Sequence, residues 1–537
     1  MPPFSRETFV SILSLAALGA AASANAVPMA LLSSTVPGAV ASAPRAGAPD
    51  PSMRLHLSVS LPLRDEAGLD AFLRDIYNPS SPNYRHYLSV ADFTLRFGPS
   101  AADYKAAADY FSTRGLTVDV NAPNRMLIGI DGRVSDIEQA FHVRLGYYRH
   151  PTERRLFLAP DREPTVDLST PLLHVTGLDD FERPKPRVLR QTVARATGSG
   201  PGGAFIGADA RVAYYGAGSL DGAGQSVGLM ELAGYNIADV QAYFTKFGPP
   251  LVTKVVGVST DGASLKCTGG CDDSEQVLDI EYTIAMAPGL TQVQVYVGKN
   301  AEDVLSHMAS DKTSLQLSTS WGWSVKEFAT DEPLLKEMAA QGQSFLTASG
   351  DYSSLSASGP WPEESADLTA VGGTDLVTKG AGGAWSSETG WPHSAGGPSL
   401  DQAIKIESYQ LPFITTTNGG SKTLRNVPDV AAIANNFYIC ADGKCDGGWA
   451  GTSFASPIWT GFVALANQQA AAAGKPPVGF LNPALYALAG GSSYATSLHD
   501  IVSGASGRFK CTPSYDLVTG LGSPDGQALI DILAAGS

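Results

Sequence analysis

The chain has 537 residues, more than one folded domain usually contains, which predicts two or more domains. Hydrophobic residues make up 44% of it, charged residues only 17%, and the formal net charge is -15 at pH 7. This acidic, charge-poor composition argues against nucleic acid and anionic membranes as partners. It is also typical of proteins that survive acid, because few groups change charge when carboxylates are protonated.

The first 26 residues are typical of a signal peptide. Arg6 supplies a positive charge, residues 9–22 form a short apolar run, and residues 24–26 form a small-x-small cleavage site. The run is too short to span a bilayer comfortably, which argues against a membrane anchor. We therefore expect a secreted protein, either extracellular or periplasmic.

Composition and hydrophobic alternation divide the next part of the chain into three segments. Residues 27–53 are rich in Ala, Pro, Ser and Gly and are predicted to be disordered. Alternating strand and helix patterns over residues 54–180 predict a small α+β domain. Residues 181–204 combine basic side chains with a Gly-rich run and predict an exposed, cleavable linker, although a plain interdomain linker has the same composition.

From residue 205 onward, short apolar strands alternate with helices. This alternation predicts an α/β domain over residues 205–537, with a mostly parallel sheet flanked by helices. Catalytic side chains in such a sheet lie at the carboxyl ends of the strands. The expected strands cover residues 226–230, 293–297, 315–318 and 344–347, and two of the expected helices cover residues 273–286 and 301–310.

Five cysteines cannot all pair within one chain. Cys440 and Cys445 flank a turn, and Cys267 and Cys271 bracket three residues, so each pair can form a local disulfide. A metal site built from both pairs is the alternative, but the spacings exceed those of CxxC sites and an exported protein meets an oxidising environment. Cys511 is left over, and its partner is not predicted.

Ser453 is the strongest local candidate for a nucleophile. It follows Gly451, which permits a close approach of the backbone to a ligand, and precedes a predicted helix over residues 458–472. Ser456 suits the N-cap of that helix and Pro457 its first position. Ser453 would then lie near the positive end of the helix dipole. A capped helix start without a catalytic role produces the same local pattern.

The histidines of this region, His307, His393 and His499, do not occur in a setting typical of subtilisin-type peptidases. Glu275 and Asp279 are instead four residues apart in a predicted helix, so their carboxylates share one face. Apolar neighbours favour burial of that face, with shared protons and shifted pKa values. A solvated acidic face is the common alternative.

A third carboxylate, Asp351, follows a predicted strand in the segment Ser349-Gly350-Asp351. Its position after a strand places it at the edge of the sheet where catalytic groups gather. A turn-forming aspartate explains the segment equally well.

Taken together, these segments resemble the sedolisin family, the serine-carboxyl peptidases, in precursor form. Residues 54–180 resemble its activation prodomain, and residues 205–537 resemble its subtilisin-like catalytic domain. The matching segments occur in the family's order: Tyr84-Arg85-His86-Tyr87-Leu88-Ser89, Phe97-Gly98-Pro99-Ser100, Glu275-x-x-x-Asp279, Ser349-Gly350-Asp351, Ala370-Val371-Gly372-Gly373-Thr374, Pro428-Asp429-Val430, Gly451-Thr452-Ser453 and Thr519-Gly520-Leu521-Gly522.

The resemblance implies that Ser453 is the nucleophile and Glu275 its general base. Asp279 would orient Glu275 and share its protons, and Asp351 would donate a hydrogen bond to the oxyanion. An aspartate donates only when protonated, and a glutamate base works best near its pKa of about 4.3, so both roles imply activity in acid. Two further residues match outer members of the same hydrogen-bond network, Glu231 and Trp321.

The resemblance also implies one bound Ca²⁺ ion near the C-terminus. Oxygen ligands from carboxylates and carbonyl groups suit this ion. Residues 512–516 depart from the family's Gly-x-Gly-x-Asp pattern, and the conformation of that loop depends on angles that glycine adopts most easily. The implied ligands are the side chains of Asp500 and Asp516 and the carbonyl groups of Ile501, Thr512 and Ser514.

These expectations define a secreted, acid-active serine-carboxyl endopeptidase made as a self-processing zymogen. Its prodomain would act as an intramolecular inhibitor, its substrates would be proteins and peptides, and a monomer is expected. A tripeptidyl aminopeptidase of the same family is the alternative, and a substrate with a blocked amine would separate the two. A catalytically inactive binding protein is disfavoured because the four reacting side chains are intact. Nothing in the sequence fixes the side-chain specificity.

Overall fold

The computed structural model describes residues 29–119, 122–191, 197–268, 271–324, 328–355 and 361–536. The domain over residues 205–537, called the catalytic domain below after the resemblance noted above, is built on an eight-stranded sheet. Six strands run parallel in the order β13 (Lys254–Ser259), β14 (Gln292–Val297), β12 (Ser226–Glu231), β15 (Gln316–Thr319), β17 (Ser344–Ala348) and β18 (Thr369–Thr378). At the far edge β18 also pairs with antiparallel β19 (Trp385–Gly390) and parallel β22 (Val430–Ile433). The predicted mostly parallel sheet is confirmed.

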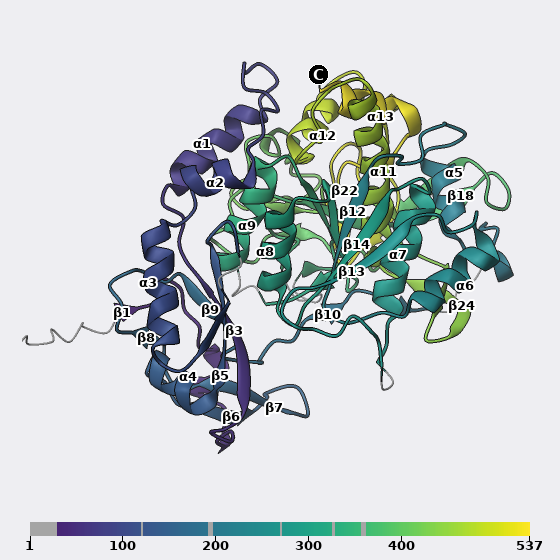
Figure 1. Cartoon of the computed structure of the whole chain (residues 1–537). Helices are drawn as coiled ribbons and strands as arrows, with labels where there is room; N and C mark the ends of the chain where they lie inside the picture. The colour runs from purple at the N-terminus through teal and green to yellow at the C-terminus, as the bar shows by residue number, and fades with distance from the viewer. Residues whose placement is uncertain are drawn as a thin grey trace, which may run out of the picture.

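Helices cover both faces of this sheet. Successive residues of a strand point to opposite faces, so Leu229 of β12 packs in one apolar layer and its neighbour Met230 in the other. The first layer contains α7 (Ser274–Met286) and α11 (Thr452–Ala472), and the second contains α8 (Ala301–Asp311) and α9 (Phe328–Ala340). The second layer faces the N-terminal domain (Figure 1).

The N-terminal domain is α+β, as predicted. An antiparallel sheet in the order β4 (Thr117–Asp119), β5 (Leu127–Arg133), β3 (Arg54–Ser60) and β9 (His174–Thr176) packs with α3 (Ala101–Ser112) and α4 (Val134–Phe141). Two further helices, α1 (Glu66–Ile76) and α2 (Val90–Arg96), place apolar side chains in the same cluster as α8 and α9. The two domains therefore share an apolar contact.

The segment predicted to be disordered, residues 27–53, differs from that prediction where the structure describes it. β1 (Met29–Ala30) pairs with β8 (Thr165–Val166). β2 (Arg45–Gly47) pairs with β6 (Leu145–Arg149), and β6 pairs on its other side with β7 (Leu156–Pro160). The many Ala, Pro, Ser and Gly residues here suggested disorder, but composition does not show the strand edges with unpaired N–H and C=O groups that accept these short strands. The predicted signal peptide lies outside the described residues.

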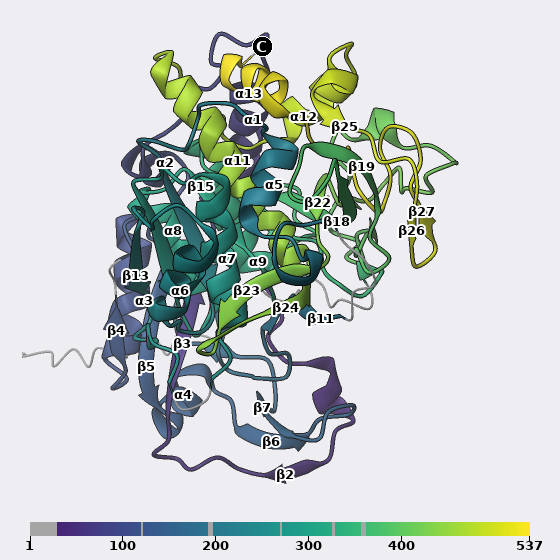
Figure 2. The same cartoon turned by 90° about the vertical axis from the view of Figure 1, so that its right-hand side faces the viewer.

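The remaining elements surround the sheet of the catalytic domain (Figure 2). A hairpin of β23 (Phe437–Ala441) and β24 (Lys444–Ala450) contacts α7 and also α6 (Ile237–Phe247). Short strand pairs form between β20 (Gly397–Pro398) and β21 (Asn426–Val427), β25 (Leu498–His499) and β28 (Ser523–Pro524), and β26 (Ala505–Ser506) and β27 (Phe509–Lys510). The other helices are α5 (Gly207–Tyr214), α6 (Ile237–Phe247), α12 (Asn482–Ala489) and α13 (Gly526–Ala535).

The cysteines pair locally as predicted. Cys267 is bonded to Cys271, and Cys440 is bonded to Cys445 across the β23–β24 hairpin. Cys511 is buried and has no disulfide partner. Among the described helices, none has the length and apolar character needed to cross a membrane.

Candidate active site

The helix that carries Ser453 begins earlier than the sequence predicts. α11 starts at Thr452 with Gly451 as its N-cap, so Ser456 is not the cap and Pro457 is not at the first position. The prediction rested on local cap and proline preferences, which the packing of a nearly fully buried helix overrides. Ser453 therefore lies within the first turn, buried, at the positive end of the helix dipole.

Pro457 has a consequence for the carbonyl group of Ser453. Proline has no N–H, so it cannot donate to the carbonyl group four residues earlier in the helix. The hydroxyl group of Ser320, which follows β15, lies 3.2 Å from that carbonyl oxygen. The same hydroxyl lies 2.8 Å from Oδ1 of Asp279. Ser320 thus links the start of α11 to the carboxylate pair.

Glu275 and Asp279 are both buried on α7, which packs against α11. Burial raises the pKa of Glu275 well above its ordinary value, and the Ser453 hydroxyl opposes this shift. Burial also raises the pKa of Asp279 well above its ordinary value, as do the charges of Glu231 and Glu275. The predicted burial and shared face of this pair are confirmed, and the solvated alternative is wrong.

Glu231 extends the carboxylate pair into a buried cluster. It lies at the carboxyl end of β12, and Nε1 of Trp321 donates a hydrogen bond to its Oε2 at 2.8 Å. Burial raises the pKa of Glu231 to about 8, against the opposing hydrogen bonds of Trp321 and Asp279. Carboxyl groups this close exchange protons as one unit, so the ionisation of Glu275 depends on the whole cluster.

Asp351 lies directly beyond β17, beside the start of α11. Its Oδ1 accepts hydrogen bonds from the amide and the hydroxyl group of Thr452, both at 2.8 Å. Its Oδ2 is buried and has no hydrogen-bond partner among the described residues. Burial raises the pKa of Asp351 to about 7, against the opposing effects of Thr452 and Arg187. Below this pH the carboxyl group keeps a proton that Oδ2 can donate.

The linker between the domains runs through this site. β10 (Lys185–Pro186) pairs antiparallel with β16 (Trp321–Gly322). β11 (Leu189–Arg190) pairs antiparallel with β24, and Figure 2 labels both of these strands. Arg187 lies between the two strand pairs, and the Ser453 hydroxyl donates a hydrogen bond to its carbonyl oxygen. The linker therefore occupies the cleft as an extended peptide, with one carbonyl group against the nucleophile.

Gly451 explains how that carbonyl group comes so close. Its φ of 152° lies in a region that favours glycine. A Cβ atom at this position would lie 2.4 Å from the Arg187 carbonyl oxygen and 2.7 Å from Oδ2 of Asp351. The two oxygens thus face the same small space, where an oxyanion formed from the carbonyl group would meet a protonated Asp351.

This arrangement supplies the groups that acyl transfer needs: a serine nucleophile, a carboxylate base and a hydrogen-bond donor for the oxyanion. The histidines have other partners. The Nδ1 atom of His307 lies 2.9 Å from the Asp303 carbonyl oxygen, and His393 and His499 pack against tryptophan rings. The geometry therefore brings together all four predicted catalytic residues and does not bring a histidine to Ser453.

The donor role that the resemblance implies for Asp351 predicts different results for two substitutions. Asp351→Ala removes the donor and should lower kcat by about 100- to 1,000-fold. Asp351→Asn can keep its oxygen on Thr452 and present its amide to the oxyanion, so it should retain much more activity. Because the pKa of Asp351 is raised to about 7, wild-type activity should fall as the pH rises through 7, and this fall should be weaker in Asp351→Asn. Steady-state pH profiles measure both effects, and equal losses with unchanged profiles would contradict the donor role.

The C-terminal loop joins the implied calcium ligands in two pairs, Asp500 with Ser514 and Asp516 with Thr512. Both carboxylate oxygens of Asp500 accept from the Ser514 amide, at 3.1 and 3.0 Å. The carboxylate of Asp516 accepts four hydrogen bonds, from Thr512, Val518 and twice from Thr519. No described residue donates to the implied carbonyl ligands, those of Ile501, Thr512 and Ser514. The all-oxygen set fits Ca²⁺, although Asp516 must release a hydrogen bond to become a ligand.

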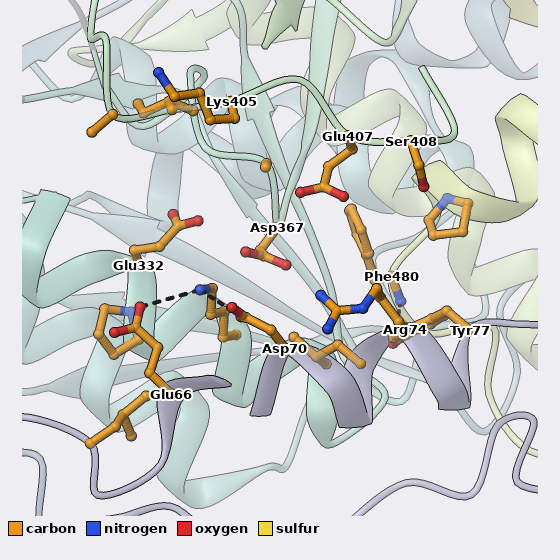
Figure 3. Close-up of a pocket in the computed structure, with 18 of the residues that line it drawn as sticks. Glu66, Asp70, Arg74, Tyr77, Glu332, Asp367, Lys405, Glu407, Ser408 and Phe480 are labelled. Atoms are coloured by element: carbon orange, nitrogen blue, oxygen red, sulfur yellow. Dashed lines mark hydrogen bonds and ion pairs between the residues drawn. The ribbon is translucent and has the colours of Figure 1, made fainter. Parts of the chain in front are cut away.

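Charged side chains also hold the N-terminal domain to the catalytic domain. A cavity of about 770 Å³ lies between α1 and the catalytic domain (Figure 3). Lys336 of α9 forms ion pairs there with Asp70 at 2.9 Å and Glu66 at 3.5 Å. On the side of the catalytic domain, burial raises the pKa of Glu332 above its ordinary value. Burial also raises the pKa of Asp367, to well above its ordinary value. The contact of α1 with α9 thus depends partly on ionised carboxylates of the N-terminal domain.

A second charged contact joins β3 to α8. A ring nitrogen of His56 lies 3.1 Å from Oδ2 of Asp303, and Ser58 donates to the same oxygen at 2.6 Å. Burial alone would lower the pKa of His56, but the hydrogen bond and charge of Asp303 and the charge of Asp131 raise it to about 9. His56 is therefore charged at neutral and acid pH, and its ion pair with Asp303 joins the two domains.

Comparisons with known proteins agree with this geometry. Residues 41–181 match the family model of the pro-kumamolisin activation domain. Kumamolisin from Bacillus sp. (strain MN-32) is 30% identical over 522 residues, covering 89% of this chain and 92% of kumamolisin. Tripeptidyl-peptidase 1 from Mus musculus is 25% identical over 547 residues, covering 91% of this chain and 93% of that peptidase. The solved structure of Pseudomonas sedolisin shares the fold, with a TM-score of 0.53, 23% identity, and coverage of 64% of this chain and 98% of that one.

The fold and the site define a serine peptidase of subtilisin-like fold that is preceded by an activation domain. The similarity to kumamolisin extends over nearly the whole of both chains and is high enough to show common descent. The chain belongs to the sedolisin family of serine-carboxyl peptidases.

Sequence reasoning missed several residues of the site. It did not single out Thr452, which orients Asp351, or Ser320, which joins Asp279 to α11. It also did not single out Arg187 and Glu363, whose side chains form a buried ion pair at 2.8 Å. The basic residues of the linker were a signal, but a sequence pattern does not show which of them enters the cleft.

Proposed function

We propose that this protein is a secreted endopeptidase that is active in acid and made as a self-processing zymogen. One observation carries the proposal: an extended segment of the chain crosses the cleft, paired with the catalytic domain on both sides of Ser453. A cleft that accepts chain on both sides of the nucleophile suits cleavage within a protein. The N-terminal domain, held over this cleft by the linker, would act as its inhibitor.

In the proposed reaction, Ser453 attacks the carbonyl carbon and passes its proton to Glu275. Asp279 and Glu231 hold the remaining protons of the cluster, and protonated Asp351 donates to the oxyanion. The base must be ionised while the donor must be protonated, so activity requires a pH at which the cluster is only partly ionised. The raised pKa of Asp351 extends the protonated state of the donor well above the range of an ordinary carboxyl group.

Acid would also favour release of the N-terminal domain. The ion pairs of Lys336 with Asp70 and of His56 with Asp303 each need an ionised carboxylate. Loss of these ion pairs would remove a partner from a cation on each contact surface, which would weaken the inhibited form. The same change of pH would thus open the cleft and prepare the site.

A tripeptidyl aminopeptidase is the second candidate, because tripeptidyl-peptidase 1 is a relative over most of this chain. The test uses acid-incubated protein, from pH 2 to 8, with an acid-denatured protein and with one peptide in free and N-acetylated forms. An endopeptidase cleaves both peptides internally, with a maximum in acid. Release of tripeptides from the free peptide alone would instead establish the second candidate. A maximum well above pH 7, where Asp351 has lost its proton, would contradict the role given to Asp351.

We also propose one Ca²⁺ ion at the C-terminal loop, held by Asp500, Asp516 and the carbonyl groups of Ile501, Thr512 and Ser514. A ligand present at 100 times its Kd stabilises the folded state by about 2.7 kcal/mol, so chelation should lower the melting temperature measurably. Asp500→Asn should remove this response to calcium. Asp525→Asn is the control, because the carboxylate of Asp525 is half-exposed and lies 3.7 Å from His499. This variant should keep the response to calcium. Identical melting curves with calcium and with chelator would contradict the proposal.

A further inference from the structure

We propose that the pocket beside the nucleophile selects a basic side chain, arginine before lysine, on the residue that precedes the cut bond. We further infer that the first bond the protein cuts in itself is Arg187–Val188. The inference rests on the proposed peptidase function and adds the substrate class. It is carried by the placement of Arg187, whose main chain and side chain each meet the catalytic domain.

The main chain fixes which bond is presented. The amide of Arg187 donates to the Ser320 carbonyl oxygen at 3.1 Å, which continues the pairing of β10 with β16. Its carbonyl oxygen accepts from Ser453 and lies in the space beside Gly451 and Asp351. On the far side, β11 begins at Leu189 and pairs with β24. The peptide bond that faces the nucleophile is therefore the one between Arg187 and Val188.

The side chain of Arg187 enters a pocket that ends in a carboxylate. Its Nη2 lies 2.8 Å from Oε2 of Glu363 and 3.3 Å from the Trp361 carbonyl oxygen. The Arg187 side chain is 5% exposed and that of Glu363 is 0% exposed. Burial raises the pKa of Glu363 to about 7, and the charge of Arg187 opposes that rise. An apolar side chain in this pocket would leave the buried carboxyl group without its partner.

Gly322 gives the pocket its shape. A Cβ atom on Gly322 would lie 2.2 Å from Nη2 and 2.7 Å from Cζ of Arg187, so the guanidinium group lies flat against the main chain of β16. This flat space suits the planar guanidinium group of arginine better than the tetrahedral ammonium group of lysine. The two acceptors, Glu363 and the Trp361 carbonyl, both contact Nη2. All three residues belong to the catalytic domain, so the pocket remains when the linker leaves.

The linker offers a natural control in Arg190. Its guanidinium group also pairs with a carboxylate of the catalytic domain, Asp446 at 2.9 Å, and lies over the Trp449 ring. The Arg190 side chain is 51% exposed, so water can replace this partner at little cost. The buried pair is therefore the one expected to select substrates.

The proposed cut balances as an ordinary acyl transfer. The Ser453 oxygen bonds to the Arg187 carbonyl carbon, and the serine proton passes to Glu275. The C–N bond to Val188 breaks as Glu275 returns the proton to the leaving amine. Water then adds to the ester, giving the Arg187 carboxyl group and restoring the serine hydroxyl.

The test begins with the full precursor in acid, followed by mass spectrometry and N-terminal sequencing over time. Wild type should yield a new N-terminus at Val188. Arg187→Leu should slow this cut by about 100-fold or more, because it leaves Glu363 without a partner, whereas Arg190→Leu should leave it within about 3-fold. A first cut at another bond that is insensitive to Arg187→Leu would overturn the assignment.

The second arm uses activated enzyme and peptides that differ only in the residue before the cut bond. Values of kcat/KM should fall in the order Arg, Lys, Leu, and Glu363→Gln should reduce the preference for Arg over Leu at least 10-fold. Cleavage of the Leu peptide by Glu363→Gln shows that the variant is folded. Equal rates for all three peptides in wild type would overturn this inference and leave the peptidase function intact, whereas no cleavage of any peptide would overturn both.

Discussion

Ser453→Ala should leave the precursor at full length in acid and lower peptidase activity by about 10⁴-fold or more. The hydroxyl group of Ser453 is the group that contacts the linker carbonyl oxygen, and neither Glu275 nor Asp351 can replace a missing nucleophile. The measurement is the time course of chain shortening by gel and mass spectrometry, together with cleavage of an added peptide. Full-length variant mixed with active wild type should be cut slowly in trans.

Ser456→Ala is the matched control for this prediction. Ser456 lies on the same helix and is also buried, but its hydroxyl group pairs with that of Ser318 at 2.9 Å and does not contact the linker. The control should process at close to the wild-type rate. Shortening of Ser453→Ala alone in solution, at a rate near that of wild type, would place the nucleophile elsewhere.

Glu275→Gln should lower kcat by about 10⁴-fold, because an amide cannot accept the serine proton. The substitution keeps the size of the side chain, and the residue is buried where burial already favours a neutral group, so the fold should be retained. The loss should therefore appear in kcat at every pH, with the melting temperature nearly unchanged. Pre-steady-state cleavage and thermal unfolding measure the two quantities.

Glu281→Gln provides the comparison on the same helix. Glu281 is also buried, and burial raises its pKa well above the ordinary value, but its hydrogen bond comes from the Cys440 amide at 3.3 Å. A neutral side chain is replaced by another of equal size, so activity should remain within a few-fold of wild type. Equal loss in both variants would mean that helix α7 tolerates no amide and that Glu275 has no special role as base.

Local patterns in the sequence predicted the parallel sheet and the buried carboxylate pair, and each of these predictions has a physical reason. Apolar strands such as β12 and β14 are buried on both faces, so their composition alone identifies them. Glu275 and Asp279 were identifiable because a helix fixes which residues share a face, and their apolar neighbours indicated burial. The ordered set of short segments then indicated the family before any contact was known.

The failures came from features that depend on distant parts of the chain. Pro457 suggested a later start of α11, but Ser320, more than 130 residues away, satisfies the carbonyl group that this proline leaves free. Residues 29–53 have the composition of a disordered segment and nevertheless pair with strand edges of the N-terminal domain. Glu363 has no local signature, and only its contact with Arg187 identifies it as the proposed specificity residue.

The two strand pairs that hold the linker have a kinetic consequence. A bond cut between β10 and β11 lies within one molecule, so the first cut should follow first-order kinetics with a half-time that does not change on dilution. Each product remains tethered, because β10 stays paired with β16 and β11 with β24. The N-terminal product keeps its new carboxyl terminus in the cleft and competes with incoming substrate. Activity should therefore lag behind chain cleavage, with dissociation of this product as the slow step of activation.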